Sequence, residues 1–177
     1  SIEDFVKYYE SSHICYVMYD CFVKSKIFSK NDLKEPHIYN LYVDSETKIA
    51  LSLMFRQWRF NRDLIGKDHP ASMLIGRYDE KYNVYEVDGV YNSLENLEFV
   101  RDFKKGKYLI WFYVLCEKCD PIPEEIVFRC YSTNKFNLQY CGKDKTFKVM
   151  KKMLLDGIKE KDVEKYNKDP KIYTSID

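Results

Sequence analysis

The sequence has no long hydrophobic run and no excess of either charge, and both absences exclude classes of protein. No stretch of about 18 or more consecutive apolar residues occurs, so we expect no transmembrane segment. The 29 Lys and Arg residues nearly balance the 28 Asp and Glu residues, and a net charge of +1 gives no overall field that attracts nucleic acid. We therefore expect no nucleic-acid partner, and any anionic membrane must be bound by a local cluster of lysines.

The short motifs of common cofactor and metal sites are also missing. Glycine-rich phosphate loops, the HExxH motif and the EF-hand loop do not occur. Cys116 and Cys119 form a CxxC pair, but the pair lies between two strand-like segments, and no second pair of ligands shows zinc-site spacing. This position favours a hairpin loop, whereas an independent thiol or zinc enzyme would show a reactive cysteine or bound metal. We expect no catalytic residue, no resident metal and no cofactor in this chain.

The remaining cysteines and the histidines also indicate structural rather than catalytic or metal-binding roles. Six irregularly spaced cysteines do not suggest a disulfide framework, because a chain of 177 residues can bury a core without one. We expect free thiols in a reducing, cytoplasmic compartment. His13, His37 and His69 are expected at the surface or as caps.

Most of the chain alternates apolar and polar residues with a period of two, which indicates β-strands. Within residues 49–57, the side chains from Ile49 to Phe55 alternate, so we expect one buried face and a solvated face that carries Ser52 and Arg56. About eight strands are predicted, at 14–23, 37–43, 49–57, 72–80, 83–87, 107–115, 125–131 and 136–141. The fold class is therefore mainly β, an antiparallel β-sandwich with a short helix at each end.

Helical periodicity marks both ends of the chain. Residues 1–13 begin with Ser1 as a candidate N-cap and carry an apolar face. From Lys145 a second apolar stripe is flanked by lysines, and Pro170 ends the pattern. This second helix could dock on the sandwich, bind a partner or lie on a membrane surface. We divide the chain into 1–13, the sandwich at 14–142, and the helix and tail at 143–177.

Several segments, in chain order, resemble the calpains, a family of intracellular cysteine proteases. SIEDFVKYYESSHIC (1–15) is similar to the end of the calpain protease core. KKGKYLI (104–110) stands where the family has PPGEYLI, with Gly106 and Tyr108 in their places. NSLENLEFVRDFKKGKYLIWFYV (92–114) resembles the family segment in which an Asn, a helical turn and an RF pair precede PPGEYLI. Three further segments resemble strands of the third calpain domain: LSLMFRQWRFNRD (51–63), SMLIGRYDEKYNVYEV (72–87) and IVFRCYS (126–132).

The resemblance implies a β-sandwich domain that follows the protease core in a calpain-type endopeptidase. The catalytic Cys, His and Asn of the family belong to the core, so this chain is expected to lack them. Its implied function is non-catalytic: it would hold and regulate the core of the same parent chain, which makes proteolysis a property of the parent. The alternative is a stand-alone β-sandwich module that binds calcium, lipid or another protein.

The resemblance also suggests two binding loops. The family's acidic, calcium-responsive loop corresponds to residues 43–48, where Asp44 and Glu46 are the carboxylates. Calcium prefers six to eight oxygen ligands, so two carboxylates predict weak binding at most. Lys104, Lys105 and Lys107 are the candidate contacts to anionic phospholipid or to the neighbouring domain.

Overall fold

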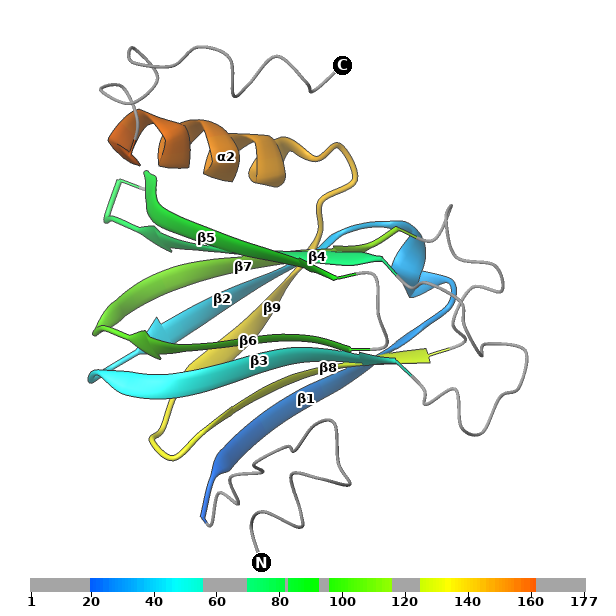
Figure 1. The fold of residues 1–177 in the computed structure, drawn as a ribbon, viewed down its shortest axis with the longest axis horizontal. Coiled ribbons are helices and arrows are strands. Elements are labelled where there is room, and N and C mark those ends of the chain that lie inside the picture. Colours follow the sequence, from blue (N-terminus) through cyan, green and yellow to red (C-terminus); the bar gives the residue numbers. More distant parts are fainter. Residues whose placement is uncertain (1–19, 56–69, 82, 93–95, 116–124, 162–177) are drawn as a thin grey trace, which may run out of the picture.

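A computed structural model describes residues 20–55, 70–81, 83–92, 96–115 and 125–161, and the structural statements below concern these residues. Two antiparallel sheets face each other, and a helix lies on the outer surface of one of them (Figure 1). The predicted class, a mainly β sandwich, is confirmed.

Four strands form the first sheet, sheet A, in the order β1-β8-β3-β6. Their bounds are β1 (Phe22–Ser29), β8 (Glu125–Ser132), β3 (Thr47–Phe55) and β6 (Asn96–Phe103). Sheet B has the order β5-β4-β7-β2-β9. Its strands are β5 (Val84–Asn92), β4 (Ala71–Tyr78), β7 (Gly106–Val114), β2 (His37–Val43) and β9 (Asn137–Lys143), and a single 3-10 turn, η1 (Asp32–Lys34), connects β1 to β2.

The core lies between the two sheets and follows from the alternation of each strand. Ile49, Leu51 and Leu53 of β3 are fully buried, as predicted, and aromatic residues from both sheets fill the core around them. The largest of these aromatic side chains are Tyr108, Phe28, Phe103, Phe112 and Phe128. Burying each large apolar side chain contributes about 1.5–3 kcal/mol, so this layer is the main source of stability.

A lysine covers one open side of the sandwich. Lys26 of β1 pairs across the sheet with Phe128, so it points toward the core side of an edge strand. Its Nζ lies 3.5 Å from the centroid of the Tyr140 ring of β9, in a cation–π contact. A charge on the inner face of an edge strand also discourages pairing with another chain.

The helix α2 (Lys148–Lys161) packs on its own domain, which was one of three alternatives that the sequence left open. Met153 of α2 is fully buried in a small cluster with Val84 and Trp111. The Asp144 carboxylate accepts hydrogen bonds from the backbone amides of Val149 and Met150, at 3.0 and 3.1 Å, and so caps the helix. In the described part of the chain, no helix is long and apolar enough to cross a membrane.

Three local predictions differ from the structure. Residues 96–103 form strand β6, where no strand was predicted, which makes nine strands among the described residues. The first strand spans Phe22–Ser29, whereas it was expected at 14–23, a segment that lies largely outside the described residues. Ser52 is only 6% exposed, although a solvated position was expected. It lies in a central strand between Glu98 and Arg129, whose longer side chains can shield it.

Candidate functional site

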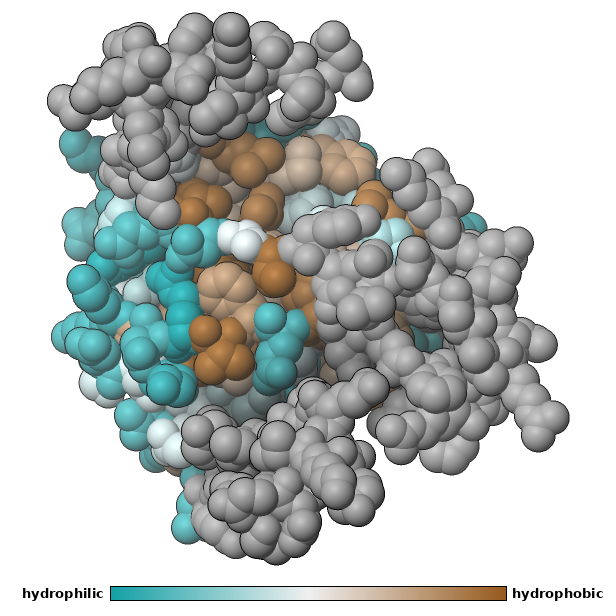
Figure 2. All heavy atoms as spheres, viewed as in Figure 1, coloured by the Kyte–Doolittle hydropathy of each residue, from teal (hydrophilic) through white to brown (hydrophobic). Residues whose placement is uncertain are grey.

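The two loops predicted as binding sites lie side by side at one end of the sandwich. Val43 pairs with Gly106 in sheet B, and Thr47 pairs with Phe103 in sheet A. The connections between these residues, 44–46 and 104–105, therefore cross from one sheet to the other as neighbours. Both cross at the left end in Figure 1, and Figure 2 shows hydrophilic atoms gathered at that end.

The backbone of the 104–105 turn is held from both sides. The Tyr108 hydroxyl donates to the carbonyl of Lys104 at 2.8 Å, and the Arg77 guanidinium donates to the carbonyl of Lys105 at 2.7 Å. Gly106 has a φ of 158°, and a Cβ atom at this position would lie 2.9 Å from Nε of Arg77. Residues other than glycine rarely adopt this positive φ, whereas the flexible end of Arg77 can move aside, so the backbone angle is the main reason that glycine stands here.

The three candidate lysines do not lie on one surface. Lys104 and Lys105 are exposed in the turn, next to the connection that carries Asp44 and Glu46. Lys107 lies within β7 and alternates with the buried Tyr108, so its side chain faces the outer surface of sheet B. The structure thus brings Lys104 and Lys105 together with the two carboxylates and places Lys107 on another surface.

This arrangement limits what the acidic loop can bind. Asp44 and Glu46 are both exposed, and the neighbouring ammonium groups repel a divalent cation. Among the described residues, no group of three or more His, Cys, Asp or Glu side chains is arranged to hold a metal ion. The end of the sandwich therefore presents mixed charge, with two lysines available to an anionic surface.

His37 was expected at the surface or as a cap, but it is the buried first residue of β2, with 1% exposure. One ring nitrogen, Nε2, lies 2.9 Å from the carbonyl oxygen of Asp32, and Nδ1 lies 3.0 Å from the Tyr140 hydroxyl. A neutral imidazole satisfies both contacts by donating from Nε2 and accepting at Nδ1. Burial lowers the pKa of His37 to about 4, and the hydrogen bond to Asp32 opposes this only in part. His37 therefore has a structural role.

The described cysteines are free thiols with different surroundings. Cys130 is fully buried in the core, and burial raises the pKa of its thiol well above the ordinary value. Cys141 is exposed, yet desolvation also raises the pKa of its thiol. Neither has the lowered pKa of a reactive thiolate. The CxxC pair at Cys116 and Cys119, and also His13 and His69, lie outside the described residues.

The outer face of sheet A carries an apolar patch. On β1, Phe28 points into the core and is 1% exposed, whereas Val23 and Ile27 on the opposite face are 49% and 62% exposed. They pair with Tyr131 and Val127 of β8, which share that face. We call these four residues the β1 patch. No described helix covers this face, unlike the outer face of sheet B (Figure 1).

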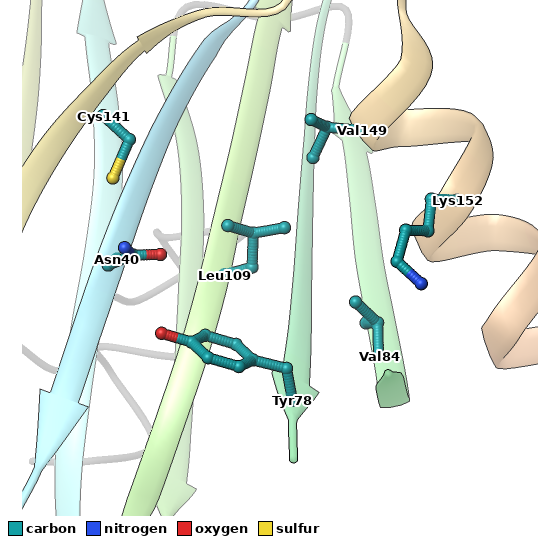
Figure 3. A pocket seen from close by; sticks show the side chains of 7 residues that line it. All are labelled: Asn40, Tyr78, Val84, Leu109, Cys141, Val149 and Lys152. Atoms are coloured by element: carbon teal, nitrogen blue, oxygen red, sulfur yellow. The ribbon is translucent and has the colours of Figure 1, made fainter. Parts of the chain in front are cut away.

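A pocket is present on the opposite side of the molecule. It has a volume of about 300 Å³ and lies between α2 and the outer face of sheet B. Figure 3 shows the seven residues that line it: Asn40, Tyr78, Val84, Leu109, Cys141, Val149 and Lys152. Sequence reasoning missed this pocket, because only the packing of α2 on the sheet creates its wall.

Comparison with known proteins adds little to this description. The sequence matches no family model and no curated protein. A chain in a cryo-EM structure of Broad Bean Stain Virus is 5% identical, with a TM-score of 0.41, over 75% of this chain and 95% of that chain. A chain from the structure "CBM4 structure and function" is 10% identical, with a TM-score of 0.23, over 67% of this chain and 61% of that chain. Neither likeness carries an argument about function.

Proposed function

We propose that this chain is the non-catalytic β-sandwich domain of a calpain-like intracellular cysteine protease, and that it holds and regulates the protease core. The observation that carries the proposal is the exposed pair Val23 and Ile27 on β1. This strand is the first described element after residues 1–13, the segment that resembles the end of a protease core.

The β1 patch has the chemistry of a contact surface for another domain. Val23 and Ile27 are 49% and 62% exposed, and a partner that removes them from water stabilises the complex by about 25 cal/mol per Å² of apolar area. Tyr131 adds an aromatic ring whose hydroxyl donates to Glu98 at 2.6 Å, so the polar group stays satisfied when the patch is covered. Ser25 and Arg129, which are exposed and pair between the two apolar pairs on this face, give the surface a mixed character. Interfaces between domains of one chain are commonly of this partly polar kind.

The surroundings of the ionisable residues support a non-catalytic function. His37 uses both ring nitrogens for contacts within the sandwich, and Cys130 fills part of the core. These residues are occupied in stabilising the fold, which suits a domain that positions a separate catalytic unit. The catalytic Cys, His and Asn would belong to the parent protein.

A weak role in calcium or phospholipid binding belongs to the same proposal. Asp44 and Glu46 supply the carboxylates, and Lys104 and Lys105 supply the positive charge for lipid phosphates. The alternative, a stand-alone lipid-binding or protein-interaction module, would use the same end of the sandwich without a protease core.

Binding to a calpain-type protease core tests the proposal. The isolated core is titrated with this chain in a calorimeter, and we expect saturable binding that Ile27→Asp abolishes. Leu155→Asp is the matched control, because Leu155 of α2 is 60% exposed, close to the 62% of Ile27, but lies on the other side of the sandwich. Absence of binding, or equal loss in both variants, would contradict the proposal.

A further inference from the structure

The pocket beside α2 has the shape of a small-molecule site. Its volume of about 300 Å³ lies at the lower end of the range, about 300–1,000 Å³, that is typical of such sites. Leu109 of β7 forms the floor, because it alternates with the core residues Tyr108 and Ile110 and so faces outward. Val84 and Val149 form an apolar wall (Figure 3). An apolar body of a few carbon atoms fits this space.

The polar groups of the pocket stand at its borders. In Figure 3 the carboxamide of Asn40 points toward Leu109 from one side, and the ammonium group of Lys152 lies near Val84 on the other. The Lys152 Nζ donates a hydrogen bond to Oδ2 of Asp156 at 2.7 Å. An ammonium group has three donors, so this bond leaves capacity for a second acceptor.

Charged groups of both signs lie around this opening. Lys107 occupies the position directly across the strands from both Tyr42 and Tyr78, on the same outer face. Lys148 lies one helical turn before Lys152 and is exposed. Asp156 is the facing carboxylate of α2, and Glu86 of β5 is engaged by Arg77 at 3.6 Å. Asp79, which follows Tyr78, is engaged by the backbone amides of Lys81 and Asn83. Lys152 is the one charged residue among the seven that line the pocket, so the charged group that the lining itself can bind is an anion.

We propose that this pocket binds a small amphipathic carboxylate, with its apolar body against Leu109, Val84 and Val149 and its carboxylate at Lys152. The Asn40 carboxamide offers a second hydrogen bond to the ligand from the opposite border. This site lies on the outer face of sheet B and is independent of the contact proposed for the β1 patch on sheet A.

Octanoate is a suitable probe, because it combines a short alkyl chain with one carboxylate. We expect a titration followed by methyl NMR to give saturable shifts at Val84, Leu109 and Val149. Lys152→Met should weaken the binding of octanoate about tenfold, the effect of one lost charge-assisted hydrogen bond. Lys152→Arg should retain most of the affinity. Lys135→Met, a change to a lysine that lies near Phe22 and away from the pocket, should have no effect.

Octanol tests whether the carboxylate contributes to binding, because it carries a similar alkyl chain without a charge. The proposal expects octanol to bind at least about tenfold more weakly than octanoate in the wild type, and equally weakly in Lys152→Met. Leu109→Trp should fill the floor and abolish binding, provided that its NMR spectrum remains that of a folded protein; the lysine variants test the site without this condition. Absent shifts, shifts centred on Val23 and Ile27, or equal binding of octanoate and octanol would overturn the proposal.

Discussion

Gly157 of α2 lies so close to Val87 of β5 that a Cβ atom on Gly157 would stand 2.9 Å from the Val87 side chain. An irregularity in the pairing of β4 and β5, between Ile75 and Arg77, accompanies a φ of 50° at Glu86. The helix therefore meets the sheet through a glycine, next to the position where the strand pairing shifts. This contact holds α2 against the outer face of sheet B, where the helix contributes Val149 and Lys152 to the pocket.

We expect Gly157→Ala to destabilise the protein, although alanine has the higher helix propensity. The propensity gain is about 1 kcal/mol, whereas overpacking against Val87 costs about 1–3 kcal/mol. Urea denaturation should show a net loss of about 1 kcal/mol, and the double variant Gly157→Ala, Val87→Ala should recover part of it. A Gly157→Ala protein more stable than the wild type would show that α2 can move away from β5.

Stability should decrease as the pH falls from about 6.5 to about 4, because His37 is buried as the neutral imidazole. Its pKa is lowered from 6.5 to about 4, so the unfolded chain binds the proton first and unfolding becomes easier in this window. The contribution is complete above pH 6.5 and amounts to at most about 3 kcal/mol. His37→Gln should flatten the dependence of the free energy of unfolding on pH in this window. If the slope of the free energy of unfolding against pH is unchanged in this variant, groups other than His37 cause the pH dependence.

Calcium binding by the 44–46 connection is expected to be weak, with a Kd of about 1 mM, because the loop offers two carboxylates beside two lysines. Calorimetric titration should detect this binding in the wild type and lose it in the double variant Asp44→Ala, Glu46→Ala. Calcium binding that persists in the double variant would place the ion elsewhere in the chain.

Anionic vesicles should bind through the turn at 104–105 in a salt-sensitive manner. We expect Lys104→Gln and Lys105→Gln each to weaken co-sedimentation with phosphatidylserine vesicles by about 1 kcal/mol, or roughly fivefold. Lys107→Gln should have a smaller effect, because its side chain lies on the outer face of sheet B. Equal effects of all three substitutions would contradict the separation of these lysines.

The alternating pattern was sufficient to predict the sandwich, and it also contained a signal for the histidine. His37, Tyr39, Leu41 and Val43 share one face of β2, so the burial of His37 follows from its position in the alternation. Strand β6 was harder to recognise, because Arg101 stands at an inner-face position between Leu97 and Phe103. Its guanidinium lies 4.8 Å from the Phe103 ring centroid, which makes a charged side chain compatible with this position.

The two candidate loops could be located from the sequence, but it could not be predicted that they lie side by side. Pairing of Val43 with Gly106 joins residues that are far apart in the chain, and no local pattern predicts it. The pocket depends in the same way on the docking of α2 against β4 and β5, where Met153 approaches Gly76. Long-range packing therefore determines both sites.

Hydrogen exchange on a mixture of this chain and a calpain-type protease core tests the central claim most directly. If the sandwich holds the core through the β1 patch, the amides of Phe22–Ser29 should exchange more slowly when the core is added, while those of α2 should keep their rates. Unchanged exchange in β1, or protection confined to α2, would contradict the assignment of sheet A as the docking face.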